Sequence, residues 1–233
     1  MLSDIEHRLY TSPGEYIDSD HPALRKHAAW VTACAPTDEG KAQCLYLAVR
    51  DEIRYDPYLD YGSLDVYRAS SVLEARRGYC VGKASLFAAL ARAIGIPARI
   101  GFADVRNHLA TKRLLETVGS DVFAWHGYVE IYLGERWVKV TPTFNDTLCA
   151  KLGVAPLPFD GTSDALLQPF DAEGRQFMAY LNDHGTFHDV PAKFLVGEMA
   201  RLYPKLCATM AGQGELKRDM EREAEEDAAA MRR

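Results

Sequence analysis

The sequence predicts an α+β fold, with helices in the first part of the chain and an antiparallel sheet after them. Two observations support this order. Apolar residues recur at helical spacing in several segments before Gly95. Residues 122–133 and 136–141 instead combine β-branched and aromatic residues on either side of a two-residue turn, which is typical of a hairpin. No internal repeat is visible, so we expect one core with additions.

The helices of the first part are predicted from their caps and apolar stripes. Asp18-Ser-Asp-His-Pro22, with acidic residues and an early proline, indicates a helix over residues 23–34. Thr37 opens a second helix that ends before Asp56-Pro57. Ser71-Val-Leu-Glu74 fits a capping box and predicts a short third helix.

Cys80 follows a glycine turn and begins the most strongly patterned helix, which Gly95-Ile-Pro97 ends with a glycine cap and a proline. The positive end of a helix dipole favours a thiolate, and the thiolate is the form that attacks carbonyl carbon. Cys80 is therefore the candidate nucleophile. The alternative is a buried packing residue, because most free cysteines are inert. The apolar stripe behind Cys80 consists of Ala84, Phe87, Leu90, Ala91 and Ile94.

The hairpin predicts which side chains share a face. Gly134-Glu135 joins its strands, and the register that pairs Glu130 with Lys139 also sets two aromatic rings opposite each other. In this register His126 and Thr141 are diagonal neighbours, roughly 7–8 Å apart. A further strand is predicted over residues 98–103, followed by a polar, partly helical connection over 105–121.

Two segments resemble the transglutaminase-like cysteine enzyme superfamily. They are Gly-Tyr-Cys80-Val-Gly-Lys-Ala, which runs on to Gly-Ile-Pro-Ala-Arg99, and Trp-His126-Gly-Tyr-Val-Glu with its partner Arg-Trp-Val-Lys-Val-Thr141-Pro-Thr. The resemblance covers about residues 40–147 and implies a papain-like core, with the cysteine helix packed on an antiparallel sheet that carries a histidine and an acid. It also implies acyl transfer through a thioester, with Cys80 as nucleophile and His126 as general base.

The third position of the implied triad departs from the family pattern. Thr141 stands where the superfamily usually has an aspartate, whose charge orients the imidazole and stabilises the imidazolium. A threonine hydroxyl can accept a hydrogen bond but supplies no charge. Asn145 is the alternative orienting residue, with Asp146 behind it. Glu130 lies on the same face, but we expect it to pair with Lys139.

Aromatic residues near these positions are candidates for contact with a substrate: Tyr79, Trp125 and Tyr128. The backbone N–H of Cys80 is a natural oxyanion donor, and the hydroxyl of Tyr61, Tyr67 or Tyr79 could supply a second.

A polar cluster, Asp104-Val-Arg-Asn-His108, follows the strand over 98–103 and either contacts a substrate or braces the sheet, and we favour bracing. The spacing of His184 and His188 does not fit a zinc-binding helix. No metal or other cofactor is expected.

Composition limits the classes of partner. The net charge of -6 leaves no basic footprint for nucleic acid. Five cysteines form an odd set without a Cys-x-x-Cys pair, which indicates a reducing compartment. The first residues lack the pattern of a signal peptide and no apolar run could span a bilayer, so we expect a cytoplasmic protein without a membrane partner. Oligomeric state is not predicted.

The predicted organisation is a core over residues 1–148, an irregular extension over 149–209 that contains a helix interrupted at Pro204, and a charged tail over 210–233 that is solvated rather than a partner-binding helix. The predicted function is cysteine-nucleophile acyl transfer on a peptide bond or glutamine side chain. Hydrolysis is preferred over transamidation, because nothing indicates an amine site. The alternative is a catalytically weak or inactive peptide-binding module, which Thr141 favours.

Overall fold

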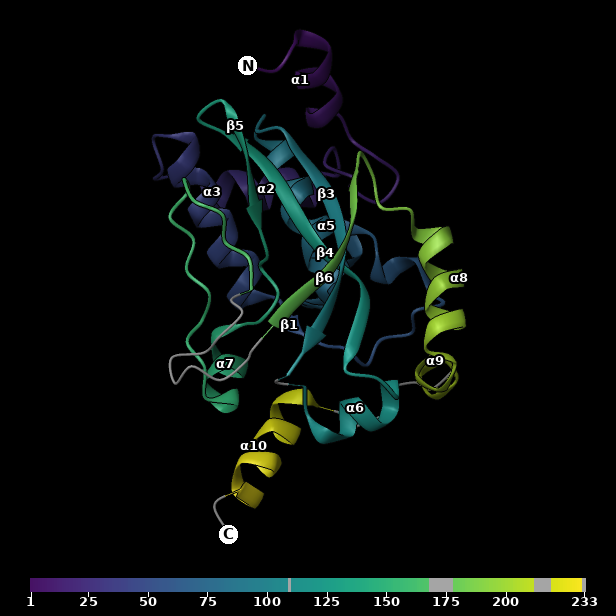
Figure 1. Ribbon diagram of the computed structural model, residues 1–233. Coiled ribbons are helices and arrows are strands. Elements are labelled where there is room, and N and C mark those ends of the chain that lie inside the picture. The colour runs from purple at the N-terminus through teal and green to yellow at the C-terminus, as the bar shows by residue number, and fades with distance from the viewer. Residues whose placement is uncertain (109, 168–177, 212–218, 232–233) are drawn as a thin grey trace.

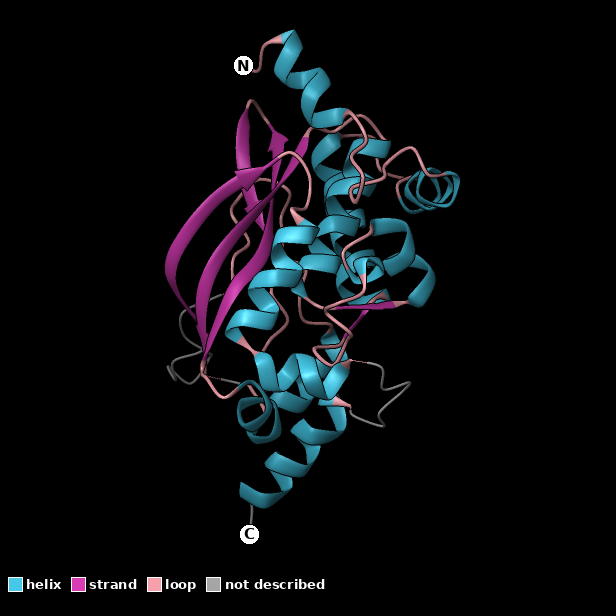
Figure 2. Ribbon diagram, turned by 90° about the vertical axis from the view of Figure 1, so that its right-hand side faces the viewer, coloured by secondary structure: helices cyan, strands magenta, loops and turns pink. Residues whose placement is uncertain are grey.

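A curved antiparallel sheet of four strands, in the order β5-β4-β3-β6, forms one layer of the computed structural model, and helices form the other (Figure 1, Figure 2). The structure describes residues 1–108, 110–167, 178–211 and 219–231. Helix α5 packs against β4 and β3. The expected α+β fold, with the cysteine helix on an antiparallel sheet, is thus confirmed. The bounds are β3 Ala98–Asn107, β4 Val122–Leu133, β5 Arg136–Val140, β6 Met178–Phe187 and α5 Cys80–Ala93.

Helices before α5 cover its other sides, so that every residue from Val81 to Arg92 is buried. Even Lys83 is buried, and its Nζ donates to the carbonyls of Arg50 and Ile53. A short parallel pair, β1 Arg54–Tyr55 and β2 Arg77–Gly78, leads into α5. The helical segments before α5 are α1 Asp4–Thr11, α2 Pro22–Val31, α3 Asp38–Leu47, the π-helix Ala48–Glu52, the 3-10 helix Leu64–Val66 and α4 Ala69–Ala75.

The predicted capping box at Ser71 is wrong. Helix α4 already begins at Ala69, and no side chain of its N-cap Arg68 caps it. Asp18, from the segment before α2, instead accepts the N–H of Ser70 at 3.1 Å. A carboxylate brought by the fold therefore replaces the local cap that the sequence indicates.

The predicted hairpin register is confirmed from Val129 opposite Val140 to Leu133 opposite Arg136. Gly134 and Glu135 both have positive φ, 53° and 64°, as a type I′ turn requires. Strand β3 extends beyond the predicted residue 103 to Asn107, because β6 pairs with it on the side away from β4.

The segment after residue 148 is more ordered than predicted. Strand β6 completes the sheet, whereas an irregular extension was expected there. Its exposed, polar residues hide the alternation of a half-buried strand. Helices α7 Asp146–Leu152, α8 Ala192–Leu202 and α9 Pro204–Met210 flank the sheet, with the break at Pro204 as predicted. Residues 168–177 of the predicted extension lie outside the described residues.

The charged tail forms helix α10, Met220–Met231, which packs against α7 and against α6, Lys112–Val118. Its carboxylates anchor it: Glu221 lies 2.8 Å from Lys151, and Glu223 accepts the hydroxyl of Tyr58 at 2.6 Å. The expectation of a solvated tail is therefore wrong for these residues, because ion pairs and the buried apolar side chains of Met220 and Ala224 together hold the helix. Among the described residues, no helix combines the length and apolarity needed to cross a bilayer.

Candidate active site

Cys80 and His126 line the same cavity, a narrow space of about 40 Å³ in which His126 is buried and Cys80 is partly exposed. Cys80 is the first residue of α5, and His126 lies in β4, which packs against that helix. Aromatic and aliphatic side chains form the remaining wall. The fold thus brings together the two residues that the sequence singled out as nucleophile and base.

Gly127 sets how closely strand and helix approach. A Cβ at this position would lie 2.9 Å from Val81 Cα and 3.2 Å from the Val81 nitrogen, which is closer than side chains tolerate. The missing side chain lets the Gly127 N–H reach the sulfur of Cys80, where it acts together with the N–H groups of Val81 and Cys80. These three donors lower the pKa of the thiol, because they stabilise a negative sulfur.

Burial nevertheless outweighs these donors. Desolvation raises the pKa of the Cys80 thiol to about 11, although the helix start predicted a lowered value. The same effect lowers the pKa of His126 to about 4, since the ring is only 5% exposed. Nε2 of His126 is buried and has no hydrogen-bond partner among the described residues. The resting cavity therefore holds a neutral thiol beside a neutral imidazole that can accept a proton.

A roof of side chains from three helices covers most of the cavity. Tyr203, between α8 and α9, accepts the N–H of Ala124 at 2.6 Å and donates to the carbonyl of Val122 at 3.0 Å. One hydroxyl thus satisfies two backbone groups of β4 just ahead of His126. The sequence did not indicate this cover, which also comprises Leu114, Val118, Met199 and Leu206.

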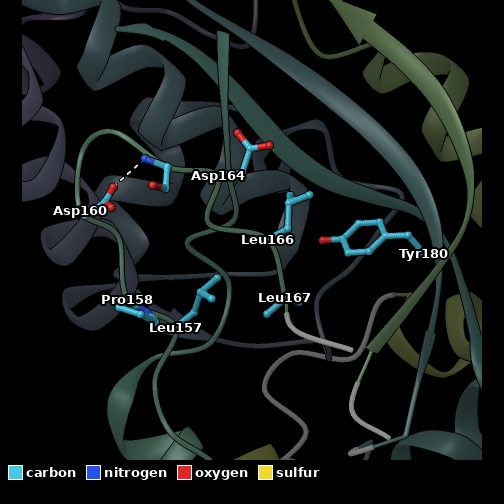
Figure 3. Close-up of a pocket in the computed structure, with 8 residues that line it drawn as sticks. Leu157, Pro158, Asp160, Asp164, Leu166, Leu167 and Tyr180 are labelled. Carbon is cyan, nitrogen blue, oxygen red and sulfur yellow. Dashed lines mark hydrogen bonds between the residues drawn. The ribbon is translucent and has the colours of Figure 1, made fainter. Parts of the chain in front are cut away.

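Thr141 is buried just after β5, where its N–H donates to the carbonyl of Ala165 and not to β4. Its hydroxyl has no hydrogen-bond partner among the described residues, so the predicted bond to the imidazole is not formed. The hydroxyl of Tyr180, from β6, interacts with Thr141 and with the backbone N–H of Leu167. The Tyr180 ring also meets His126 edge to face, with 6.4 Å between centroids. Sequence reasoning missed Tyr180 because it did not predict β6. Figure 3 shows this tyrosine at the wall of a separate pocket of about 450 Å³.

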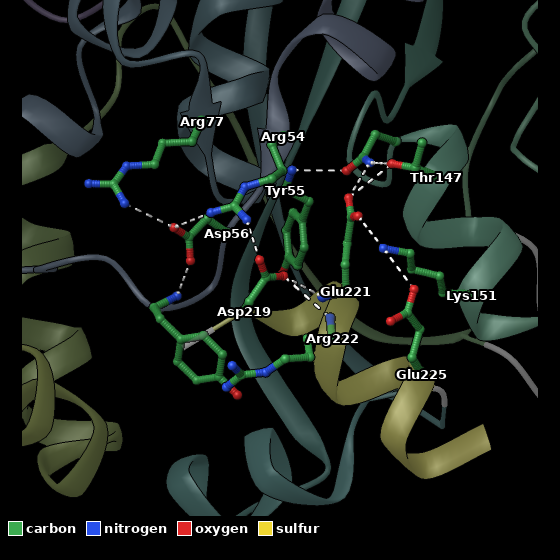
Figure 4. A network of polar contacts seen from close by, with 12 residues as sticks. Arg54, Tyr55, Asp56, Arg77, Thr147, Lys151, Asp219, Glu221, Arg222 and Glu225 are labelled. Carbon is green, nitrogen blue, oxygen red and sulfur yellow. Dashed lines mark hydrogen bonds and ion pairs between the residues drawn. The ribbon is translucent and has the colours of Figure 1, made fainter. Parts of the chain in front are cut away.

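Asn145 is committed to a different network. Its Oδ1 accepts the N–H of Tyr55 at 3.0 Å, and its Nδ2 donates to Thr147 and Glu221 at 2.6 and 3.0 Å. Glu221 belongs to α10 and also binds Lys151 (Figure 4). The structure gives Asn145 an anchoring role for α10 and does not bring its amide to the imidazole.

Two carboxylates, Asp146 and Glu130, were also considered as orienting groups, and both have partners elsewhere. Asp146 accepts the N–H of Thr147 at the start of α7. Glu130 accepts from Arg99 at 2.7 Å, while the expected partner Lys139 is 3.9 Å away. The pairing of Glu130 with Lys139 is therefore secondary to its bond with Arg99.

Of the three candidate substrate contacts, Tyr79 and Trp125 line the cavity of Cys80. Tyr128 does not. It packs over Gly101, where a Cβ would lie 2.2 Å from its ring, and its hydroxyl donates to Asp183 at 3.1 Å. Tyr128 therefore serves the outer face of the sheet and a separate pocket of about 360 Å³.

The tyrosine hydroxyls proposed as oxyanion donors are partly engaged. Tyr61 donates to the carbonyl of Pro57 at 2.7 Å, and Tyr67 donates to the carbonyl of Tyr61 at 3.0 Å. Their single protons are thus used by the backbone. The N–H groups of Cys80 and Gly127 are better placed, since both interact with the sulfur.

The polar cluster that begins at Asp104 lies within β3 up to Asn107 and is not a loop. The sequence missed this because β6 supplies the second neighbour that keeps the strand paired. Asp104 accepts a hydrogen bond from the backbone N–H of Trp125 at 3.1 Å. Trp125 is left-handed, with φ of 58°, which costs a non-glycine residue roughly 1–2 kcal/mol.

The two histidines considered for metal binding have protein partners. His184 Nε2 lies 2.7 Å from Asp104, and His188 Nε2 lies 3.0 Å from the carbonyl of Leu9 and 3.1 Å from the hydroxyl of Ser12. Within the described parts of the chain, no three His, Cys, Asp or Glu residues gather as a metal site would require.

A cysteine at the first turn of a buried helix and a histidine of the antiparallel sheet packed on that helix thus line one cavity of an α+β protein. Residues 25–142 match the family model of the transglutaminase-like superfamily, Transglut_core. The chain belongs to this superfamily.

Solved structures are similar at low sequence identity. That of a putative cysteine protease from Cytophaga hutchinsonii is 20% identical, with a TM-score of 0.50 over 82% of this chain and 50% of that protein. The chain thus spans half the length of that protein, and the likeness supports the fold alone. A putative protease from Parabacteroides distasonis is 13% identical, with a TM-score of 0.38 over 57% of this chain and 26% of that one. No curated protein matches the chain.

Proposed function

We propose that this protein is a cysteine enzyme that transfers the acyl group of an amide through a thioester on Cys80, with His126 as general base. The observation that carries the proposal is the shared cavity, in which a thiol ringed by three backbone N–H groups lies beside an imidazole whose Nε2 has no described partner. Membership of the transglutaminase-like superfamily supports the same chemistry.

The chemistry begins when the Cys80 sulfur attacks the carbonyl carbon and its proton passes to Nε2 of His126. The backbone N–H groups of Cys80 and Gly127 are the candidate donors to the oxyanion. The imidazolium then gives its proton to the leaving amine as the C–N bond breaks, which leaves a thioester. Water attacks the thioester and loses a proton to His126, which returns it to the departing sulfur. The products are a carboxylic acid and the free thiol.

We assign the orientation of His126 to packing against the neutral ring of Tyr180, whose hydroxyl lies near Thr141; neither Nε2 of His126 nor the Thr141 hydroxyl has a hydrogen-bond partner among the described residues. This assignment is supported by the contact of Tyr180 with both residues and by the commitment of Asn145 to α10. A neutral orienting group holds the ring but does not stabilise the imidazolium by charge. We therefore expect slower turnover than an aspartate would allow.

A peptide or glutamine side chain requires the roof to move. The cavity of about 40 Å³ is far smaller than the roughly 300–1,000 Å³ of an ordinary ligand pocket. Helices α8 and α9 carry most of the roof, so their displacement is the simplest route for a substrate.

We place the protein in the cytoplasm, because all five cysteines are free thiols and a reducing compartment keeps them so.

The test uses two chromogenic amides, a peptide p-nitroanilide and a γ-glutamyl p-nitroanilide, with release of p-nitroaniline as the signal. We expect release that Cys80→Ala and His126→Ala each abolish, and hydroxylamine should trap the thioester as a hydroxamate. A fluorescent primary amine distinguishes the acceptors: hydrolysis is preferred if the amine is not incorporated. Release that is unchanged in Cys80→Ala would overturn the proposal.

A second candidate function is peptide binding without turnover, favoured by the uncharged Thr141. It predicts that peptides bind to wild-type protein and to Cys80→Ala with equal affinity and are recovered intact. Isothermal titration with mass spectrometry of the recovered peptide separates the two functions.

A further inference from the structure

Asp104 occupies the middle of β3, between the two strands that flank the candidate site. One oxygen of its carboxylate, Oδ1, accepts the backbone N–H of Trp125 in β4 at 3.1 Å. The same oxygen lies 2.7 Å from Nε2 of His184 in β6. A single carboxylate oxygen thus links the strands on both sides of β3.

The contact on the β4 side lies at a bulge. Ala103 pairs with His126, but Val105 pairs with Phe123, so two residues of β4 stand opposite Asp104. One of them is Trp125, with its left-handed backbone. A bulge of this kind changes the direction of the side chains that follow it, and His126 is the next residue.

The contact on the β6 side lies at a second bulge. Phe102 pairs with Gly185 and Ala103 pairs with Asp183, which leaves His184 as the extra residue. The imidazole of His184 stacks on the Trp125 ring, with 4.0 Å between centroids and an angle of 12°. Asp104 therefore holds both the backbone of Trp125 and the ring that packs on its side chain.

We propose that Asp104 is a positioning residue for the reaction, and that its carboxylate holds Trp125 in the left-handed conformation that aims His126 at Cys80. The inference rests on the proposed function, because it assigns Asp104 a role only through His126. A left-handed tryptophan is strained and persists only where its surroundings hold it. Without the carboxylate, Trp125 relaxes toward an extended backbone and His126 turns away from the sulfur.

The experiment measures alkylation of Cys80 by iodoacetamide from about pH 5 to pH 9. The histidine effect of a protein is its labelling rate divided by the labelling rate of the same protein with the additional change His126→Ala. Asp104→Ala should reduce this effect by about tenfold or more, since a displacement of about 1 Å in an active site can cost a hundredfold. Asp104→Asn should keep it within about threefold, because an amide oxygen can still accept the N–H of Trp125.

Asp121→Ala is the matched control, since it removes another carboxylate beside β3 and β4 that pairs with Arg106 instead. It should leave the histidine effect unchanged. If Asp104→Ala does not fold, Asp104→Leu takes its place, because leucine keeps the bulk of the side chain but cannot accept the N–H of Trp125. A histidine effect as large in folded Asp104→Leu as in wild-type protein would overturn the positioning role. Equal labelling of wild-type protein and His126→Ala, with the pH profile of an ordinary thiol, would instead refute the proposed function. A histidine effect that survives in folded Asp104→Ala would refute only the inference about Asp104.

Discussion

Gly127→Ala tests the close approach of strand β4 to helix α5. The added Cβ would lie 2.9 Å from Val81 Cα and 3.2 Å from Val81 Cγ2, whereas carbon atoms in contact are normally about 3.5–4.0 Å apart. The strand must therefore retreat by about half an ångström or more. Overpacking of this kind costs about 1–3 kcal/mol, and the lower entropy of the unfolded chain returns about 0.4–1 kcal/mol. We expect the free energy of unfolding to fall by about 1–2 kcal/mol.

Urea denaturation followed by circular dichroism measures this change, and Gly197→Ala is the matched control. Gly197 lies on α8, and a Cβ there would meet nothing within 4 Å. The control should therefore stabilise the protein, by up to about 1 kcal/mol, because alanine favours the helix. A Gly127→Ala variant as stable as Gly197→Ala would refute the tight packing. The retreat should also slow alkylation of Cys80, because it withdraws an N–H from the sulfur.

Two further predictions concern His126 and the roof. The pKa of His126 is about 4 in the folded protein against 6.5 in the unfolded chain, so the unfolded state binds more protons between these values. Lowering the pH from about 6.5 to about 4 should therefore reduce the free energy of unfolding of wild-type protein by up to about 3 kcal/mol. His126→Gln should not show this loss. Urea denaturation at the two pH values measures both changes. Tyr203→Phe removes the hydrogen bonds to Ala124 and Val122, each worth about 1 kcal/mol, so the roof should open more often and iodoacetamide should label Cys80 up to about thirtyfold faster. Labelling no faster than in wild-type protein would show that this hydroxyl does not hold the roof closed.

The hairpin could be predicted from the sequence because its signals are local. Glu130 and Lys139 face each other only in the correct register, and a slip by one residue would reverse every side chain. Strand β6 could not be predicted in the same way. Its two bulges break the alternation, and it is placed by pairing with β3, which lies some 80 residues earlier in the chain.

The candidate site likewise has a part that local sequence signals predict and a part that depends on the tertiary fold. Cys80 and His126 stand in motifs that can be recognised from the sequence, and the fold brings both to one cavity. The roof residue Tyr203 and the ring contact of Tyr180 depend on helices and a strand whose positions the sequence does not specify. The direction of the Cys80 pKa shift depends on that roof, since burial outweighs the helix start. The protonation states of site residues are therefore harder to predict from the sequence than the identity of those residues.

The closed roof and the uncharged residue at position 141 are physically consistent with each other. An aspartate at this buried position would leave a desolvated carboxylate beside an imidazole that burial keeps neutral, and an unpaired buried charge costs several kcal/mol. Thr141 and Tyr180, whose own pKa is raised to about 12, remain neutral in such a cavity. Charge then develops only when a substrate arrives and the thiol gives its proton to His126. On this reasoning Thr141 is compatible with the proposed activity, in a site that rests uncharged and ionises during the attack itself, as well as with peptide binding without turnover.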